Sequence, residues 1–370
     1  MAAKDERVTR PTCVVVLAAG EGTRMRSARP KALHHLCGRP MVMYVLDAAS
    51  HDEIEAIVVV VGHGATWVEN SLKERLRNDT RLSFVEQSEQ LGTGHAVTVA
   101  LPTIAERIGD VEGDVLIVPG DTPLLRHDTV AKLLNHHRES QAALTVLSAR
   151  VDDPFGYGRV VRARDATIAR IVEERDATPE ERLINEINTS IMVVRESLLG
   201  AALRKIGRQN SQNEYYLTDL VSALHDTGHL TNVMVLDDPT EAQGVNDRAQ
   251  LASAEAALRQ RINQEWMTRG VTMWDPGHTY VDADVQMEPD VSLLPGTILK
   301  GHCVLERGAQ VGPNANLTDC RVGRNAVVGT VEAVQADIGE DALVKSFVVL
   351  GKGSHVEAGE VIASFDYHTR

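Results

Sequence analysis

Two glycines and four basic side chains follow a short apolar run near the start of the chain, in the stretch LAAGEGTRMRSARPK, residues 17–31. A flexible backbone can bring several amide groups close to one anion, and arginine or lysine can neutralise the remaining charge. The stretch therefore predicts a phosphate-binding loop directly after a strand. A plain turn between a strand and a helix is the alternative, but such a turn has no need of the basic residues.

This stretch matches neither of two common phosphate-loop motifs. In a Walker A loop, Gly-Lys followed by Ser or Thr opens the helix, whereas Gly22 is followed by Thr23 and Arg24. The dinucleotide-binding fingerprint would need a third glycine where the chain has Met25. The prediction of a phosphate therefore depends more on the basic residues than on the glycines.

The composition of the chain limits what this loop could bind. The 370 residues carry a net charge of −14, which argues against nucleic acid or an anionic membrane as the main partner. The first residues, MAAKDERVTRP, are too charged for a secretory signal, and no apolar run is long enough to cross a bilayer. The four cysteines lack metal-ligand spacing and are expected to be reduced thiols. We therefore expect a cytoplasmic protein in which a local cluster meets any anionic ligand.

Alternating strands and helices are expected to position the loop, from Thr12 to about Val235. Short β-branched runs such as VVVLAAG, IEAIVVVVGH and DVLIVPGDTPLL are separated by longer helical patterns. Continuous apolar strands of this kind are buried on both faces, which indicates a mostly parallel sheet covered by helices. Ligands bind such sheets at the carboxyl ends of the strands. Three strands end in polar, glycine-containing segments, which we expect to form one cleft: LAAGEGTR, VEQSEQLGTG and VPGDTPLL.

A different pattern follows a polar segment from about Thr240 to Arg269, which is expected to be a long helix that bridges two parts of the chain. Aliphatic residues then recur every six positions, at Val281, Met287, Leu293, Leu299, Leu305, Val311 and Leu317. A six-residue period with glycines at the corners predicts a parallel β-helix with three hexapeptides per coil. The phase slips after Leu317 and again before Ile338. The alternative is a loop-rich β-structured tail.

An ordered series of motifs resembles one family. The motifs are LAAGEGTRM, EQLGTGHAV, PGDTPLL, GYGRVVR, IVEERDA, EINTS, NEYYLTD and GVN, followed by the hexapeptides. They resemble the bacterial N-acetylglucosamine-1-phosphate uridyltransferases, which are usually paired with a glucosamine-1-phosphate acetyltransferase, over residues 12 to about 320. The resemblance implies an α/β, Rossmann-like nucleotidyltransferase domain at 1–239, a linker helix at 240–270 and a left-handed β-helix at 271–370 that forms a homotrimer.

The resemblance implies UTP and N-acetylglucosamine 1-phosphate as substrates, Mg²⁺ as the cofactor, and Arg24, Lys31 and Asp121 as catalytic residues. Arg24 and Lys31 would face the reacting phosphates, because attack by the sugar phosphate on the α-phosphorus concentrates negative charge. Asp121 ends a strand, where a hard Mg²⁺ ion would favour a carboxylate, and the resemblance adds Asn246 as the second ligand. Either residue could instead cap a helix.

The resemblance also assigns residues to the nucleotide and to the sugar. The nucleotide would contact Leu17, Ala18, Ala19, Gly20, Gly22, Gln87, Gly92 and Thr93, and the sugar would contact Gly158, Glu173 and Asn188. The amide of Gln87 would distinguish uracil, because size alone does not separate it from other bases. Taken in isolation, Gln87 could be an exposed residue at a strand end, and Glu173 could be a surface charge.

The chain departs from the family pattern at several positions. Pro119 stands where tyrosine or serine is common, and Ser190 stands where glycine or alanine is usual, so another sugar 1-phosphate is a rival substrate. In the C-terminal part, LGKG at 350–353 replaces the Leu-Arg-Pro-Gly turn of the acetyltransferase, and its later coils do not follow. We therefore expect a shortened β-helix without acetyltransferase activity. A catalytically silent assembly subunit is the alternative, although such a subunit would not need the phosphate and metal residues together.

Overall fold

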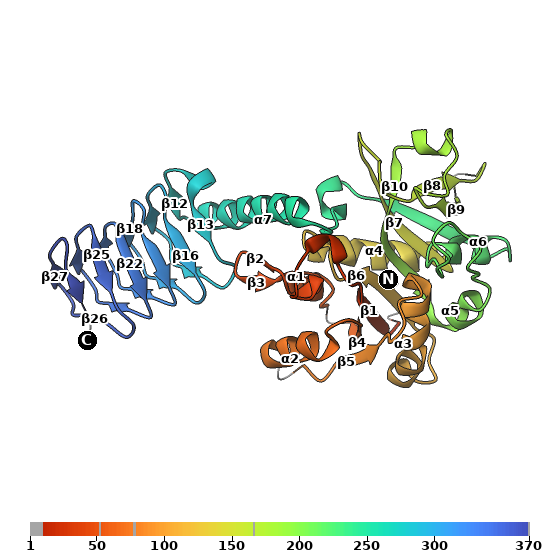
Figure 1. Cartoon of the computed structure of the whole chain (residues 1–370), viewed down its shortest axis with the longest axis horizontal. Helices are drawn as coiled ribbons and strands as arrows, with labels where there is room; N and C mark the ends of the chain where they lie inside the picture. Colours follow the sequence, from red (N-terminus) through yellow and green to blue (C-terminus); the bar gives the residue numbers. More distant parts are fainter. Residues whose placement is uncertain (1–9, 52, 77–78, 166, 369–370) are drawn as a thin grey trace, which may run out of the picture. The chain divides into compact units, whose positions relative to one another are not determined.

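The computed structural model describes residues 10–51, 53–76, 79–165 and 167–368 (Figure 1). The chain divides into two compact units. The first contains the residues up to His34 and those from Pro40 to Gln250, and the second contains His35–Arg39 and the residues from Leu251 onward. Among the described residues, none of the helices combines the length and the apolar character that crossing a bilayer requires.

The first unit is built on a sheet with the strand order β11-β7-β10-β6-β1-β4-β5 (Figure 1). The strands are β1 (Thr12–Ala18), β4 (Ile54–Val61), β5 (Leu82–Glu86), β6 (Asp114–Pro119), β7 (Leu144–Arg150), β10 (Glu186–Arg195) and β11 (Thr231–Val235). Strand β1 pairs in parallel with β4 and with β6, and β4–β5 and β11–β7 are also parallel, whereas β10 runs antiparallel to β6 and β7. The predicted, mostly parallel sheet is confirmed. A hairpin of β8 (Arg159–Arg162) and β9 (Ile168–Val172) pairs with β10 through β8.

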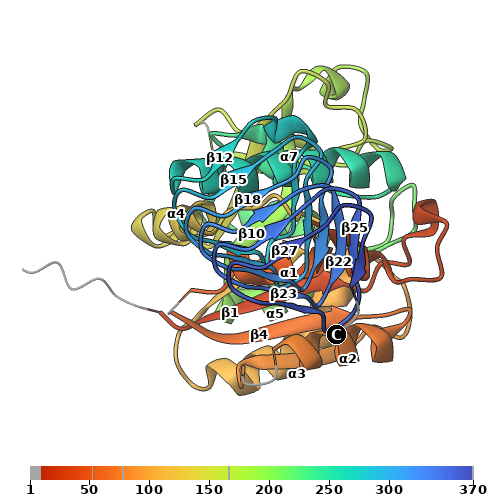
Figure 2. The ribbon, with the colours of Figure 1, turned by 90° about the vertical axis from the view of Figure 1, so that its left-hand side faces the viewer.

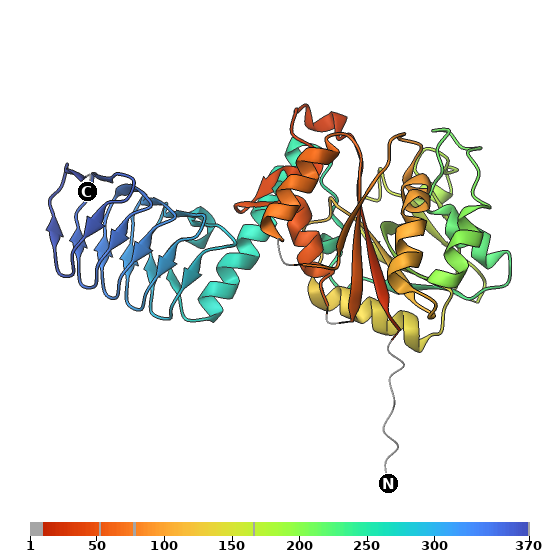
Figure 3. The ribbon, with the colours of Figure 1, turned by 90° about the horizontal axis from the view of Figure 1, so that it is seen from below.

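Helices cover both faces of this sheet (Figure 3). They are α1 (Met41–Ala48), α2 (Ala65–Arg75), α3 (Thr93–Ile108), α4 (His127–Glu139), α5 (Glu196–Leu203) and α6 (Asp219–His225). Side chains of successive strand residues point to opposite faces, so Val15 belongs to the core that includes residues of α3, α5 and α6, while Val14 and Val16 belong to the core that includes residues of α1, α2 and α4. Because both faces are buried, the strands show continuous apolar runs rather than alternation.

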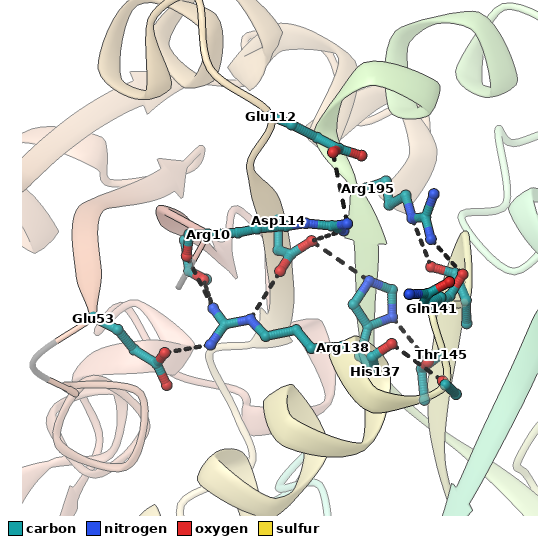
Figure 4. Close-up of polar contacts among 12 residues, drawn as sticks. Arg10, Glu53, Glu112, Asp114, His137, Arg138, Gln141, Thr145 and Arg195 are labelled. Atoms are coloured by element: carbon teal, nitrogen blue, oxygen red, sulfur yellow. Dashed lines mark hydrogen bonds and ion pairs between the residues drawn. The ribbon is translucent and has the colours of Figure 1, made fainter. Parts of the chain in front are cut away.

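A buried charged cluster lies at the amino ends of β1 and β6 (Figure 4). Asp114 is fully buried, and its Oδ2 lies 3.1 Å from Nε of Arg138, while its Oδ1 lies 3.6 Å from Nε2 of His137. Arg138 also donates a hydrogen bond of 2.7 Å to Oγ1 of Thr12 and pairs with Glu53. The cluster joins the end of α4 to the starts of two strands. It therefore stabilises the end of the sheet where β1 and β6 begin, opposite to their carboxyl ends.

In the second unit, residues 271–368 form three parallel sheets, which Figure 2 views end-on. Their orders are β12-β15-β18-β21-β24-β27, β13-β16-β19-β22-β25-β28 and β14-β17-β20-β23-β26. The strands of the first sheet are Thr272–Met273, Ser292–Leu293, Gln310–Val311, Val327–Val328, Leu343–Val344 and Val361–Ile362. Those of the second are Tyr280–Val281, Ile298–Lys300, Asn316–Thr318, Val331–Val334, Val348–Leu350 and Tyr367–His368, and those of the third are Gln286–Met287, Val304–Leu305, Arg321–Val322, Asp337–Ile338 and His355–Val356.

These sheets are those of a left-handed parallel β-helix, as predicted, and the aliphatic residues of the six-residue period are buried in its interior. The strand register explains the slips in the period. Met287 pairs with Leu305 eighteen residues on, Leu305 with Val322 seventeen residues on, and Val322 with Ile338 sixteen residues on. Two coils are therefore one and two residues shorter than the first, while the inward ladder continues.

A short hairpin from the N-terminal part of the chain, β2 (His35–Leu36) and β3 (Arg39–Pro40), is tied to the second unit by its turn. The N–H of Cys37 donates to a carboxylate oxygen of Glu255 at 2.8 Å, and its carbonyl accepts from the N–H of Ala283 at 2.9 Å. Gly38 has a φ of 81°, and a Cβ there would lie 2.5 Å from Oδ2 of Asp282, so this turn requires glycine. All four cysteines are free and buried, as expected of reduced thiols.

The long polar helix α7 spans Arg248–Thr268, so it begins later than the expected position near Thr240. The chain first makes a short 3₁₀ turn at Pro239–Ala242, capped by the side chain of Asp238. Asp247 then caps α7, because its Oδ1 accepts from the N–H of Gln250 at 2.9 Å. The residues between the turn and the helix are left free to reach the carboxyl ends of the strands.

Candidate active site

A cavity of about 420 Å³ lies at the carboxyl ends of the strands in the first unit. Many predicted site residues line it, namely Leu17, Ala19, Gly20, Gln87, Gly92, Thr93, Asp121, Asn188 and Asn246. A smaller cavity of about 60 Å³ shares Leu17, Gly20 and Asp121 with the first and is also lined by Ala18 and Lys31. The segments that end β1, β5 and β6 therefore contribute to one cleft, as the parallel sheet predicted.

Three polar side chains from distant parts of the chain meet in this cleft. Lys31 lies on a short 3₁₀ turn after β1, Asp121 follows β6, and Asn246 precedes α7. The ammonium of Lys31 contacts Oδ2 of Asp121 and donates a hydrogen bond of 2.7 Å to Oδ1 of Asn246. Asn246 does not act as a helix cap through this side chain, because Asp247 provides the cap. The arrangement places one positive charge between two hard oxygen atoms.

Gly22 makes room for Lys31. Its φ is +64°, and a Cβ at this position would lie 2.7 Å from Cβ of Lys31. A side chain would therefore be both strained and in collision with the lysine. The absence of a side chain at Gly22 therefore lets the Lys31 side chain take its position in the cleft. This role is separate from any contact of the Gly22 amide with a phosphate.

Arg24 is placed differently from Lys31. It lies on the 3₁₀ turn Thr23–Met25 and is exposed, and it is not among the residues that line the two cavities. The turn itself is anchored, because Met25 is buried and its carbonyl accepts from Nε of Arg248 at 3.2 Å. The structure therefore brings Lys31, Asp121 and Asn246 together but leaves Arg24 outside this group.

Gln87 is buried at the end of β5, with 3% of its surface exposed. Its N–H donates to the carbonyl of Val61 at 2.7 Å, and its side-chain nitrogen donates to the carbonyl of Gly92 at 3.0 Å. Thr93 opens α3, and its hydroxyl accepts from the N–H of Leu217 at 3.1 Å. Gln87 is thus an ordered residue of the cleft rather than an exposed strand end.

Gln90 is a residue of the cleft that the motif analysis did not assign. Its side-chain nitrogen donates to the carbonyl of Ala19 at 2.9 Å, and it lines the main cavity. A Cβ at Gly62 would lie 2.5 Å from this nitrogen, so the backbone just after β4 approaches the Gln90 side chain too closely for any residue other than glycine. Gln90 stands within the quoted segment VEQSEQLGTG, but only the fold shows that its side chain is hydrogen-bonded to the loop after β1.

The residues assigned to the sugar lie near one another: Gly158 directly precedes β8, Glu173 directly follows β9, and Asn188 is on β10. The N–H of Asn188 donates to the carbonyl of Gly158 at 2.8 Å, and a Cβ at Gly158 would lie 3.4 Å from Oε2 of Glu173. Oε1 of Glu173 accepts from the hydroxyl of Thr218 at 3.0 Å. Burial raises the pKa of Glu173, the Thr218 hydrogen bond lowers it, and the charges of Asp219 and Asp176 raise it further. Glu173 is therefore not an isolated surface charge.

Two of the departures from the family pattern, Pro119 and Ser190, lie on the cavity wall. Ser190 has a φ of +62° and stands where the pairing of β10 with β7 shifts register, between Asn188 and Ile191. Its N–H donates to Oδ1 of Asn188 at 3.1 Å. Tyr157, which sequence reasoning did not assign, lies on the same wall, and burial followed by the charge of Asp121 raises its pKa.

The first unit matches a known family, the MobA-like NTP transferase domain, over residues 14–190. The whole chain is similar to proteins named bifunctional protein GlmU. It is 41% identical over 351 residues to that of Desulfitobacterium hafniense strain Y51, covering 95% of this chain and 75% of the relative. It is 42% identical over 356 residues to that of Trichlorobacter lovleyi, with 96% and 75% covered. It is 43% identical over 357 residues to that of Streptomyces avermitilis, with 96% and 73% covered.

These relatives cover nearly all of the chain, so the resemblance carried by the ordered motifs is confirmed. The nucleotide-transferase match falls on the unit that holds the cleft, and the second unit carries the β-helix. The chain therefore belongs to the family of the bifunctional protein GlmU, and it is a sugar-phosphate nucleotidyltransferase.

Proposed function

We propose that this chain transfers the uridylyl group of UTP to N-acetylglucosamine 1-phosphate, which gives UDP-N-acetylglucosamine and pyrophosphate. The observation that carries the proposal is the position of Lys31, whose ammonium lies between Asp121 and Asn246 beside a cavity of about 420 Å³. A positive charge at the carboxyl ends of β1 and β6 suits a bound triphosphate.

The reaction needs positioning and charge stabilisation more than it needs a protein base. An oxygen of the sugar phosphate attacks the α-phosphorus of UTP, a new P–O bond forms, and the bond to pyrophosphate breaks. The attacking phosphate is already an anion, so no proton must be removed from it. Negative charge gathers on the oxygens around phosphorus, and Lys31 supplies positive charge there. Arg24, on its exposed turn, is proposed to add to this charge at the triphosphate.

The donor atoms in the cleft fit Mg²⁺. Among the described residues no three His, Cys, Asp or Glu side chains converge to hold a metal ion. Oδ2 of Asp121 and Oδ1 of Asn246 do converge, because both contact the same ammonium. Two hard oxygens suit an ion that keeps part of its water and binds phosphates. When bound, Mg²⁺ would neutralise charge on the phosphate oxygens, and Asp121 and Asn246 would hold it.

The two ends of the cleft are proposed to select the base and the sugar. Gln87 and Gly92 lie at the end of β5 and the start of α3, where we place the uracil. Asn188, Gly158 and Glu173 are proposed to bind the hydroxyl and acetamide groups of the sugar. Ser190 adds a hydroxyl beside Asn188, and this favours testing other sugar 1-phosphates as a second candidate.

The β-helix is proposed to form a homotrimer. In the first of its three sheets, the last three residues of one outward-facing row are apolar. These residues, Val327, Leu343 and Val361, are 38%, 36% and 57% exposed. Exposed aliphatic rows of this kind favour association, and three-fold symmetry would bury one row from each copy.

We also propose that this β-helix lacks acetyltransferase activity. Leu350 ends β25 and is buried, and in the turn that follows Lys352 is exposed and Gly353 has a φ of 78°. The arginine and proline of the acetyltransferase turn do not occur in this stretch. The expected result is no release of thiol from acetyl-CoA when glucosamine 1-phosphate is present. Thiol release that depends on glucosamine 1-phosphate would contradict this proposal.

The functional boundaries are proposed at 1–239 for the transferase, 240–270 for the linker and 271–370 for the β-helix. The hairpin at 35–39, which belongs with the second unit, is the one described segment that departs from this simple order. We place the reaction in the cytoplasm, where nucleoside triphosphates are made and used.

Pyrophosphate release tests the proposal directly. UTP and three other nucleoside triphosphates are each paired with a panel of sugar 1-phosphates, and UTP with N-acetylglucosamine 1-phosphate is expected to be the best pair. Lys31→Ala should abolish most of the release, whereas Lys73→Ala serves as a matched control, because Lys73 is an exposed lysine on α2 that pairs with Glu69. A different best pair would replace the proposed substrates, and no release with any pair would overturn the proposed activity.

A further inference from the structure

The side-chain amide of Gln87 has a defined orientation. Its nitrogen lies 3.0 Å from the carbonyl oxygen of Gly92 and 3.1 Å from Nδ1 of His95. A backbone carbonyl can only accept a hydrogen bond, so the NH₂ group and not the oxygen must face Gly92. The second N–H then meets His95, whose Nδ1 must accept while Nε2 carries the proton. Both amide hydrogens of Gln87 are therefore committed to the protein.

His95 is itself held in place by the motif that contains Tyr215. The two rings stack with centroids 6.5 Å apart, and the guanidinium of Arg208 lies 5.5 Å from the centroid of the Tyr215 ring. The backbone of Tyr215 donates to the carbonyl of Leu91 and accepts from the N–H of Gly94, both at 2.8 Å. The start of α3 and the residue before it, which carry both acceptors of Gln87, are thus hydrogen-bonded and stacked against a segment more than a hundred residues away along the chain.

We propose that His95 is a positioning residue that sets the base preference of the cleft through Gln87. With both hydrogens committed, the atom of the amide that remains for a base is Oε1, which can only accept. Uracil presents an N–H at N3, whereas cytosine presents a lone pair there. The fixed amide therefore accepts from uracil and opposes cytosine, and an amide that could turn round would donate to cytosine. This inference rests on the proposed use of UTP, and it adds the residue that makes Gln87 selective.

Substitution of His95 separates its hydrogen bond from its ring contact. His95→Phe keeps a ring against Tyr215 but removes the acceptor, and His95→Asn returns an acceptor oxygen near the position of Nδ1. We measure kcat/KM for UTP and for CTP on the same preparation, so that the ratio does not depend on the fraction of active protein. The UTP preference should fall roughly 3- to 10-fold in His95→Phe, as expected for one net hydrogen bond, and should recover in His95→Asn. The loss should appear mainly in the KM for UTP.

A matched control is available on α4. His136 is also half-buried, and its Nε2 lies 3.1 Å from the side-chain nitrogen of Asn232, so His136→Phe removes the same kind of contact away from the cavity. Its UTP to CTP ratio should equal that of the unchanged protein. A fall in the ratio in this control as large as in His95→Phe would overturn the inference, because the effect would then be general.

A double substitution tests whether His95 acts through Gln87. In a Gln87→Ala background, His95→Phe should change the UTP to CTP ratio no further, because the amide that it positions is gone. The same fold-change in both backgrounds would overturn the inference, and so would a full UTP preference in His95→Phe. These outcomes differ from failure of the proposed function, in which the unchanged protein would release no pyrophosphate from UTP.

Discussion

The ammonium nitrogen of Lys31 lies 2.7 Å from Oδ1 of Asn246, although 215 positions separate the two residues along the chain. Lys31 comes from the glycine-rich loop after β1, and Asn246 from the segment between a short 3₁₀ turn and α7. Both reach the carboxyl end of the sheet, where Asp121 completes the group. This meeting is the strongest structural reason to place phosphate chemistry in the cleft.

Loss of either oxygen ligand should impair the use of Mg²⁺. Asp121→Ala and Asn246→Ala are each expected to lower kcat about 100-fold or more and to raise the Mg²⁺ concentration needed for half-maximal rate, because the metal loses a ligand. The fold should remain intact, because neither side chain contributes to the apolar core. Removal of the metal with EDTA should stop pyrophosphate release, and added Mg²⁺ should restore it. Near-normal turnover in either variant, or a rate that is indifferent to EDTA, would show that the metal assignment is wrong.

Lys31 should act mainly on the transition state. Lys31→Ala is expected to lower kcat more than it raises the KM for UTP, since charge builds up around the α-phosphorus during the reaction. Initial rates over a range of UTP concentrations separate the two constants. A variant that changes KM alone would reduce Lys31 to a ground-state binding residue.

Gly22→Ala should impair Lys31 without touching the base site. The new Cβ would lie 2.7 Å from Cβ of Lys31 on a backbone with a φ of +64°, so the loop must move. We expect a large fall in kcat with an unchanged UTP to CTP ratio, measured by pyrophosphate release. Gly228→Ala is the matched control, because Gly228 has a φ of +79° but a Cβ there meets no atom within 4 Å. Equal effects of the two substitutions on kcat would refute the role given to Gly22.

The cluster around Asp114 should make stability depend on pH in acid. Burial raises the pKa of Asp114, but the neighbouring imidazole of His137 and the guanidinium of Arg138 outweigh burial and lower the pKa below its ordinary value of 3.8. A carboxyl whose pKa is lower in the folded state stabilises the fold above its unfolded pKa and loses this contribution as the pH falls through the folded pKa. The stabilisation is therefore present at neutral pH and declines below about pH 4.

Asp114→Asn tests this pH dependence. The variant should lower the free energy of unfolding by about 3 kcal/mol at pH 7, since it removes the buried carboxylate that pairs with the guanidinium of Arg138. It should also flatten the dependence of stability on pH below about pH 4, as measured by denaturant titration at several pH values. Asp128→Asn is the control, because the Asp128 side chain is 93% exposed. An acid slope that persists unchanged in Asp114→Asn would contradict the account.

The apolar ladder of the β-helix should control association. Leu343→Lys and Val361→Lys each place a charge in the outward row of the first sheet, and we expect them to convert a trimer into a monomer in light-scattering measurements. Asp337→Lys, at an outward position of the third sheet, is the comparison and should leave the trimer intact. A monomeric unchanged protein would refute the trimer, and dissociation by all three substitutions would show that the ladder has no special role.

The periodic parts of this protein could be predicted from the sequence alone. A six-residue period indicates the interior of a β-helix, because each hexapeptide points one residue inward. Val281, Met287 and Leu293 lie on three different sheets, and all three belong to one buried core. Continuous apolar runs such as residues 56–61 indicate a sheet buried on both faces, because every side chain of that run belongs to one of two cores. Such patterns arise because each position is either buried or exposed, and burial favours apolar residue types. The order of residue types along the chain therefore shows the pattern. The candidates Lys31, Asp121 and Asn246 could be chosen in advance from their motifs.

Only the tertiary structure decided which polar groups meet and in which orientation. The contact of Lys31 with Asn246, the commitment of the Gln87 amide to His95, and the pairing of Asp114 with His137 all depend on backbone positions set by strand order and helix packing. The assignment of the hairpin turn at Cys37 to the second unit has the same origin. A hydrogen bond requires two atoms within about 3 Å in suitable directions, and residue types spaced along a chain carry no record of that geometry.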